Sequence, residues 1–287
     1  MKADFHCHCA PYSTCARQTI DELIRRAKEA EIECIAITNH DTIKDCDLFS
    51  LKCKEAGIRY IPGVEIGARV YDKITGIPNF VKIHILGLNI KPSDEFEKEI
   101  KSFDDINRSI KDKRNSFIEQ KYRIEIPKGT LKKDIRKKLV EAGAFEDEKG
   151  AKEFLNSYEI ISRFQLEALT PEKAIFLIHQ NGGKAILAHP FQGEDHFDFN
   201  DDQVENIIQA CIKWGLDGIE VFHSSAFKKG KTEFLLNIAN KHDLLISIGS
   251  DRHFVEDYAE GHYFSFDDQM SKQNFNEINI KEILEKK

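Results

Sequence analysis

The sequence predicts an α/β fold in which strands form a closed or nearly closed barrel and a helical subdomain is inserted into that barrel. Two observations support this prediction. Short apolar runs alternate with helical segments along most of the 287 residues, and repeated strand-then-helix units imply a parallel sheet. One long charge-rich interval interrupts the alternation. In such a barrel, the chemistry takes place at the carboxyl ends of the strands.

The first third of the chain contains four predicted strands and two predicted helices. Thr19 and Glu22 have the spacing of a capping box, which predicts that a helix begins there. The strands are expected at ADFHCHC (3–9), CIAIT (34–38), IRYIPGVEIG (58–67) and FVKIHILGL (80–88), and the helices at 19–30 and 45–56.

The alternation resumes near residue 170. Thr170 is expected to cap a helix that has Pro171 in its first turn and ends at a glycine pair. Further strands are expected at AILAHP (185–190), GIEVF (218–222) and LLISIGSD (244–251), with helices at 201–214 and 232–241.

The interval between these two parts, residues 91–169, is charge-rich and mostly helical in pattern. Structureless loops of this length are rare in compact domains. We therefore predict a helical insertion subdomain at 91–169, with the barrel formed by 1–90 and 170–287.

Composition argues against several classes of protein. The formal charge of −7 argues against a general nucleic-acid coat protein. The seven cysteines include no CxxC pair, which argues against a disulfide framework and a four-cysteine zinc site. No apolar run approaches the roughly 20 residues of a membrane helix, and no signal segment is evident. We expect a cytoplasmic protein with no membrane partner and no obligate protein partner.

Two histidines lie one residue apart in the first predicted strand. Side chains alternate along a strand, so His6 and His8 project to one face and Cys7 and Cys9 to the other. We interpret the cysteines as small residues that pack toward outer helices, and the histidines as a pair.

More histidines and carboxylates follow at the ends of successive strands. They are His40, Glu65, His84, His189, Asp251 and His253. A single histidine on an apolar strand is most often a hydrogen-bonded core residue. A ring of so many imidazoles, however, would repel or stay unsatisfied without a cation. The set therefore predicts two or three divalent ions, of Zn, Mn or Fe, bridged by a carboxylate, with no organic cofactor.

At these residues the sequence resembles the polymerase-and-histidinol-phosphatase (PHP) family of metal-dependent phosphoesterases. The matching motifs, in the family's order, are FHCH (5–8), TNHD (38–41), PGVE (62–65), HILGL (84–88), LAHP (187–190) and GSDRH (249–253). The resemblance implies a distorted (β/α)7 TIM-like barrel. The insertion and DGIEVFHS (217–224) are most similar to the branch that dephosphorylates small nucleotides and trims short RNAs.

The resemblance also implies how the ligands divide among ions. A first ion would be held by His6, His8, Glu65 and Asp251. A second would be held by Glu65, His84 and His189, with Glu65 as the bridge, and a third by His40 and His253.

The sequence departs from the family's pattern in two places. After the HxH pair the family usually has an Asp or His, whereas this chain reads APYSTCAR. Either Cys15 is a soft ligand there, or the third site has only two protein ligands. Asn39 replaces the Asp of the usual TDHD, which we expect to weaken a contact behind the ligands.

For catalysis, we expect bound ions to lower the pKa of water, so that a metal-bridging hydroxide attacks phosphorus in line with the leaving alcohol. His40 or His253, where not saturated by metal, would protonate the leaving group.

Three features bear on substrate binding. Arg252 is expected at the barrel mouth, either holding a phosphate or forming a surface salt bridge. His223, just after the strand GIEVF, is a second candidate phosphate contact. Lys111–Lys138 contains 11 Lys/Arg and 4 Asp/Glu, and forms either a solvated helix face or a surface that gathers a polyanion.

These expectations favour a phosphatase for a small phosphorylated metabolite, such as a nucleoside 3′,5′-bisphosphate. The alternatives, in order, are a 5′-to-3′ exonuclease on short RNA or DNA, a histidinol-phosphate phosphatase, and a non-enzymatic metal-binding module. The expected partner is therefore a small phosphorylated substrate or a short oligonucleotide.

Overall fold

The computed structural model describes residues 2–13, 15–70, 74, 81–193 and 198–253. The chain divides into two compact units. Unit 1 comprises Met1–Lys101 and Leu169–Lys287, and unit 2 comprises Ser102–Ala168. The first boundary between the units therefore lies after Lys101, whereas the sequence pattern predicted that the insertion begins at residue 91.

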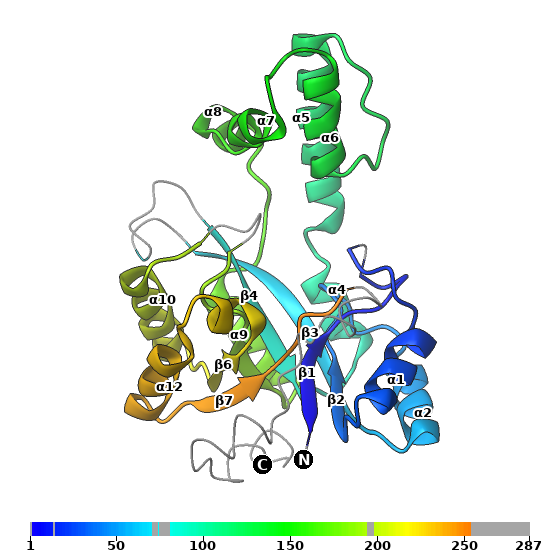
Figure 1. Ribbon diagram of the computed structural model, residues 1–287, viewed down its shortest axis with the longest axis vertical. Coiled ribbons are helices and arrows are strands. Elements are labelled where there is room, and N and C mark those ends of the chain that lie inside the picture. Colours follow the sequence, from blue (N-terminus) through cyan, green and yellow to red (C-terminus); the bar gives the residue numbers. More distant parts are fainter. Residues whose placement is uncertain (1, 14, 71–73, 75–80, 194–197, 254–287) are drawn as a thin grey trace. The chain divides into compact units, whose positions relative to one another are not determined.

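Unit 1 is built on one seven-stranded sheet whose strands lie in chain order (Figure 1). The strands are β1 (Ala3–Cys7), β2 (Cys34–Ile37), β3 (Arg59–Val70), β4 (Val81–Leu88), β5 (Lys184–Leu187), β6 (Gly218–Phe222) and β7 (Leu245–Ile248). Each predicted strand is present. β6 has the predicted bounds, and each of the others differs at one or both ends by one to a few residues. The α/β class expected from the sequence is confirmed.

The prediction of a wholly parallel sheet is wrong at β4. This strand pairs antiparallel with both β3 and β5, whereas the other four pairings are parallel. Parallel neighbours need a crossover of a dozen or more residues, usually a helix. Only residues 71–80 separate β3 from β4, and a connection that short reverses the chain direction.

The two edges of the sheet meet without forming a regular ladder. Among the described residues, β7 and β1 are joined after β7 by an isolated bridge between Cys7 and Arg252. The amide of His8 donates to the Arg252 carbonyl at 2.9 Å, and the amide of Asp251 donates to the His6 carbonyl at 2.8 Å. The barrel is therefore nearly closed, as expected.

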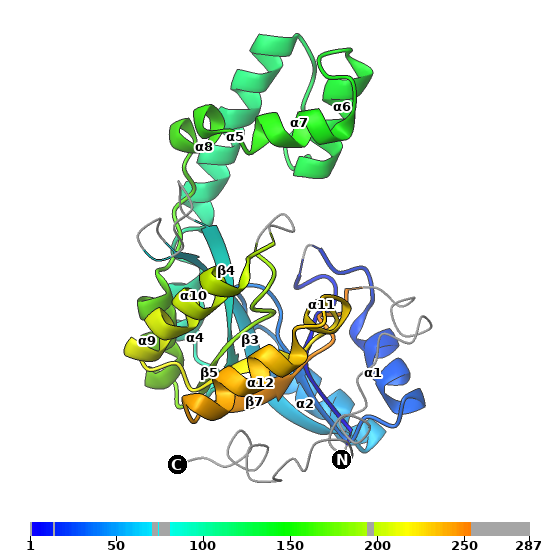
Figure 2. The ribbon, with the colours of Figure 1, turned by 60° about the vertical axis from the view of Figure 1, so that its left-hand side comes forward.

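Helices of unit 1 lie outside the sheet (Figures 1 and 2). α1 and α2 pack beside β1–β3, α9 contacts β3–β5, and α12 contacts β6 and β7. Their bounds are α1 (Ile20–Glu29), α2 (Cys46–Ala56), α4 (Asp94–Ile100), α9 (Pro171–Gln180), α10 (Asp201–Lys213), α11 (Ser224–Lys228) and α12 (Thr232–Lys241). Thr19 forms the predicted capping box with Glu22, and Thr170 caps α9.

The cysteines of the opening strand pack away from the histidines, as predicted. Cys7 and Cys9 are buried in an apolar cluster with residues of α1 and α2, such as Leu23 and Phe49. Burial raises the pKa of Cys9 to about 11, so this thiol stays protonated at neutral pH.

Unit 2 is helical and has a core of its own. It contains α5 (Asp104–Tyr122), α6 (Lys132–Glu141), α7 (Glu148–Leu155) and α8 (Tyr158–Arg163). Its core consists of Ile118, Ile126, Ile135, Leu139, Ala151 and Leu155. Within the described parts of the chain, no helix has both the length and the apolar character needed to cross a membrane.

The separate core predicts that unit 2 is destabilised by truncation of one buried leucine. Leu139 is fully buried, so Leu139→Ala is expected to cost about 2–5 kcal/mol of unfolding free energy. Leu131→Ala is the matched control, because Leu131 is 47% exposed and its loss should cost about 0.5 kcal/mol or less. Urea denaturation followed by circular dichroism measures both, and equal midpoints would contradict a packed core at this position.

Candidate metal centre

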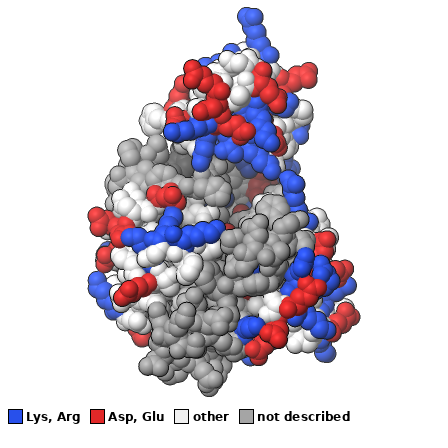
Figure 3. All heavy atoms as spheres, in the orientation of Figure 1, with Lys and Arg blue, Asp and Glu red and all other residues white. Residues whose placement is uncertain are grey.

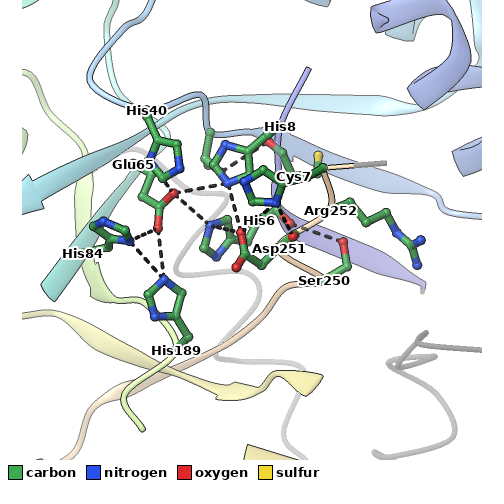
Figure 4. A network of polar contacts seen from close by, with 12 residues as sticks. His6, Cys7, His8, His40, Glu65, His84, His189, Ser250, Asp251 and Arg252 are labelled. Atoms are coloured by element: carbon green, nitrogen blue, oxygen red, sulfur yellow. Dashed lines mark hydrogen bonds and ion pairs between the residues drawn. The ribbon is translucent and has the colours of Figure 1, made fainter. Parts of the chain in front are cut away.

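Histidines and carboxylates from six of the seven strands, or the residues just after them, converge at one end of the sheet (Figure 4). They are His6 in β1, His8 after it, His40 after β2, Glu65 in β3, His84 in β4, His189 after β5, and Asp251 and His253 after β7. The structure therefore brings together all eight residues predicted as metal ligands.

The position of His84 follows from the reversed direction of β4. β1, β2, β5 and β7 deliver these side chains at or beyond their carboxyl ends, and Glu65 lies midway along the longer strand β3. His84, in contrast, lies in the first half of β4. In the antiparallel register, His84 pairs with Gly67, two residues beyond Glu65. A strand running in reverse presents its amino-terminal half at the same end of the barrel.

The first predicted ligand set is close-packed and buried. His6 Nε2 lies 3.3 Å from Glu65 Oε2 and 3.4 Å from Asp251 Oδ1. His8 Nε2 lies 3.2 Å and 3.1 Å from the same two oxygens. These four residues form a group whose donor atoms could surround one cation.

The second predicted set is equally compact. His84 Nδ1 lies 2.8 Å from Glu65 Oε1, and His189 Nε2 lies 3.2 Å from both of those atoms. Glu65 therefore offers one carboxylate oxygen to each set, which is the arrangement a bridging ligand requires.

The third set contains the predicted pair His40 and His253, to which the structure adds His8 and not Cys15. Cys15 is exposed and belongs to none of the groups of possible metal ligands found among the described residues. His8 also faces the first set, so the two groups compete for one histidine.

A buried loop network, which the sequence did not reveal, holds His8 and His40. Ser13 Oγ accepts from His8 Nδ1 at 3.2 Å and from the His40 amide at 3.0 Å. The Ser13 hydroxyl in turn donates to Asn39 Oδ1, which also accepts from the Cys9 amide. Asn39 thus keeps an acceptor oxygen where the family usually has Asp.

Glu220 of β6 orients two ligands from behind. Its carboxylate accepts from His6 Nδ1 at 3.1 Å and from the His189 amide at 2.8 Å. A His6 that donates from Nδ1 has its Nε2 free to act as a ligand. A methyl group at Gly249 would overlap both the Glu220 carboxylate and the His6 Cβ, so only glycine fits there.

Two ligand candidates have left-handed backbone conformations. His189 has φ of 28° and Asp251 has φ of 53°. Such values are uncommon for residues other than glycine and cluster at functional sites. The backbone hydrogen bonds of these two residues to Glu220 and His6 hold the conformations in place.

The buried charges shift the pKa values of the histidines and carboxylates in this cluster. Burial opposes ionisation of Glu65, but the charges of His84, His40 and His6 hold its pKa well below the usual range. Burial lowers the pKa of His84 to about 4, and burial with repulsion from His8 lowers that of His253 to about 4. Burial also opposes protonation of His189, yet its hydrogen bond to Glu65 and the charge of Asp251 raise its pKa to about 9.

The donor set fits divalent cations. Among the described residues, His6 Nε2 and Glu65 Oε2 are fully buried and make no hydrogen bond, although they lie only 3.3 Å apart. A buried polar atom without a partner costs free energy, which a cation between such atoms would recover. Imidazoles with carboxylates suit Zn, Mn or Fe.

The two predicted substrate contacts differ in their outcome. The prediction that Arg252 emerges at the barrel mouth is wrong. Arg252 is 1% exposed, its side chain points away from the ring (Figure 4), and its charge acts on the buried Asp4. Arg252 is paired in a parallel bridge with Cys7, whose side chain also packs away from the metal ligands.

His223 is closer to the ring, although it is also buried. Its Nε2 lies 4.0 Å from Asp251 Oδ2, and its ring centroid lies 5.6 Å from that of His189. Nδ1 accepts from the Ser225 amide at 3.1 Å, and burial lowers the pKa of His223. A neutral His223 therefore carries its proton on Nε2.

Cation binding is expected to release protons at neutral pH. His189, with a pKa of about 9, carries a proton at pH 7 that a cation must displace, whereas His84 and His253 are already neutral. Apparent Mn²⁺ affinity should therefore rise from pH 7 to pH 9. Calorimetry in buffers of different ionisation enthalpy measures the protons released, and the His189→Ala variant should release fewer. An affinity that is flat over this range would contradict the assignment.

With the geometry established, comparison with known proteins gives the family. The model of the PHP domain matches residues 4–169, more than half of the chain. A 5′-3′ exoribonuclease of Haemophilus influenzae is 28% identical to this chain, and the alignment covers 88% of this chain and 90% of the relative. The 5′-3′ exoribonuclease Rnm of Escherichia coli is 26% identical, over 87% and 84%. The phosphoribosyl 1,2-cyclic phosphate 1,2-diphosphodiesterase of Eggerthella lenta is 23% identical, over 88% and 94%.

Solved structures agree on the architecture. A Bifidobacterium adolescentis protein assigned as a metal-dependent phosphoesterase aligns with a TM-score of 0.65 at 25% identity, covering 98% of this chain and 95% of its own. An amidohydrolase of Chromobacterium violaceum aligns with the same TM-score at 23% identity, over 88% of each chain, and supports the fold alone. The chain belongs to the PHP family and is a metal-dependent phosphoesterase, a hydrolase of phosphoric ester bonds.

Proposed function

We propose that this protein is a 5′-to-3′ exoribonuclease that removes nucleotides from short RNA with the help of two or three divalent cations. The observation that carries the proposal is the near-full-length similarity to exoribonucleases from Haemophilus influenzae and Escherichia coli. The converging ring supports it, because clustered cations suit attack on a phosphodiester. The sequence alone favoured a phosphatase over an exonuclease, and this proposal reverses that order.

A second candidate is hydrolysis of a small phosphorylated metabolite, such as a nucleoside 3′,5′-bisphosphate. The similarity to the Eggerthella lenta enzyme, named for a phosphoribosyl substrate, favours it. The two candidates share their chemistry. In both, water adds to a phosphorus bonded to the 3′-oxygen of a 5′-nucleotide, and that oxygen leaves with a proton.

The residues divide into those that hold cations and those that contact the substrate. His6, His8, Glu65 and Asp251 would hold one ion, and Glu65, His84 and His189 a second. When bound, the ions would activate water and neutralise charge on the phosphoryl oxygens. His40 and His253 would complete a third site with His8, unless His8 remains with the first ion.

Two histidines are candidates for proton donation to the leaving 3′-oxygen. An acid must carry a proton at the working pH, and a pKa of about 4 leaves His253 neutral. His253 therefore suits a ligand. His40 is the remaining candidate, with a side chain 28% exposed and Nδ1 2.9 Å from Glu65 Oε2.

His223 is the candidate that contacts the substrate phosphate. Its Nε2 proton is directed toward the ring, and among the described residues this nitrogen has no hydrogen-bond partner. A phosphoryl oxygen bound beside Asp251 would give it one.

A panel of substrates tests the proposal. With Mn²⁺, a 5′-phosphorylated RNA pentamer should be shortened from its 5′ end, releasing 5′-mononucleotides in succession. The panel includes the same RNA labelled at the 3′ end, a nucleoside 3′,5′-bisphosphate, a 5′-mononucleotide and histidinol phosphate, followed by chromatography and phosphate release. Hydrolysis of the bisphosphate alone would support the second candidate and reject the first.

Loss of a ligand is expected to abolish turnover while the fold persists. His189→Ala and Asp251→Asn should each lower kcat about 100-fold or more, since even residues behind metal ligands contribute 10–100-fold. His242→Ala is the matched control, because His242 caps α12 and is not part of the ring. Circular dichroism verifies folding, and metal analysis should show fewer bound ions. Unchanged turnover in either ligand variant would refute the assignment.

A further inference from the structure

Unit 2 has a groove that the proposed catalytic chemistry does not use. It is lined by residues of α5 and of the end of α8: Ser109, Asp112, Lys113, Ser116, Phe117, Gln120, Arg163 and Phe164. All of these lie within unit 2, and the volume of about 560 Å³ is in the range of small-ligand sites.

The groove contains two aromatic rings that sequence spacing does not bring together. Phe117 and Phe164 are 47 residues apart in the sequence. Their ring centroids nevertheless lie 5.6 Å apart, at an interplanar angle of 44°. Both are only half-buried. Phe164 lies outside the basic segment Lys111–Lys138, so the sequence of that segment does not reveal the pair.

Cationic side chains accompany the rings. The Arg163 guanidinium lies 4.5 Å from the centroid of Phe117 and 5.6 Å from that of Phe164. Arg163 and Lys113 are both exposed, and Asp112 is the one acid in the lining. An Arg plane over aromatic rings, with a lysine nearby, combines surfaces for stacking bases with a charge for phosphate.

The charged side chains of unit 2 do not by themselves indicate a nucleic-acid site. On the face seen in Figure 3, its Lys and Arg side chains are mixed with Asp and Glu. Several are paired within the unit, such as Arg108 with Asp105 and Lys121 with Glu159. The basic segment by itself therefore reads as a solvated helix surface, and the aromatic groove is what could select a nucleic acid.

We propose that this groove is a binding site for single-stranded RNA, in which a base stacks on Phe164 beside Arg163 and Phe117, and Lys113 contacts its phosphate. Ser109, Ser116 and Gln120 supply hydrogen-bonding groups for the ribose or the base edge. The proposal rests on the exoribonuclease function, and it assigns unit 2 to substrate binding and not to chemistry.

The test measures binding separately from cleavage. Chelator-treated full-length protein is titrated with a fluorescent five-nucleotide RNA and, in parallel, with an abasic ribose-phosphate oligomer of equal length and charge. The variants are Arg163→Ala, Phe164→Ala and Lys113→Ala. Lys128→Ala is the matched control, because it removes one positive charge from an exposed turn of the same basic segment.

Arg163→Ala and Phe164→Ala are expected to weaken RNA binding at least fivefold, since stacking on a side chain contributes that much per base. The abasic oligomer should bind weakly to the unaltered protein and be insensitive to Phe164→Ala. Lys128→Ala should have no more than a twofold effect on RNA binding.

Three results would overturn the site: RNA binding unchanged in both stacking variants, an equal loss in Lys128→Ala, or equal affinity for RNA and the abasic oligomer. Turnover of a nucleoside bisphosphate should be unaltered in Lys128→Ala, because Lys128 lies outside the groove. Failure of the exoribonuclease function is seen separately, as absence of RNA cleavage by the metal-loaded unaltered protein.

Discussion

One buried carboxylate is the centre on which the rest of the site depends. Glu65 is fully buried in β3, with His6, His8 and His40 facing one oxygen and His84 and His189 facing the other. A lone ionised carboxylate in such a place would be costly, and so would a lone imidazolium. Their mutual attraction keeps Glu65 ionised and divides the ring into two donor sets that share it.

The topology of the sheet brings these side chains together. Strands in chain order, nearly closed by the contact between β1 and the residues after β7, bring His6 and Asp251 side by side. The reversal of β4 places His84 against Glu65. Behind the metal ligands, Glu220 and Ser13 accept hydrogen bonds from His6 and His8, and these bonds fix the orientation of the two imidazoles. The same residues thus stabilise the fold and orient the ligands.

The two units divide the work in the activity we propose. Unit 1 supplies the donors for cations. Unit 2 has a core of its own and an aromatic groove, so its fold does not depend on the metal ring. An insertion of this kind can change the substrate of a phosphoesterase without disturbing its chemistry.

The helices, the strands and the types of metal-binding residue could be predicted from the sequence, because each depends on a local pattern. Capping at Thr19, apolar strands of period two and histidines at strand ends depend on neighbours a few residues away. Four features became visible in the folded structure: the direction of β4, the burial of Arg252, the position of Cys15 outside the groups of possible ligands, and the contact between Phe117 and Phe164. Each of these depends on segments far apart in the chain, whose pairing is set by packing and connection length and leaves no mark in local pattern.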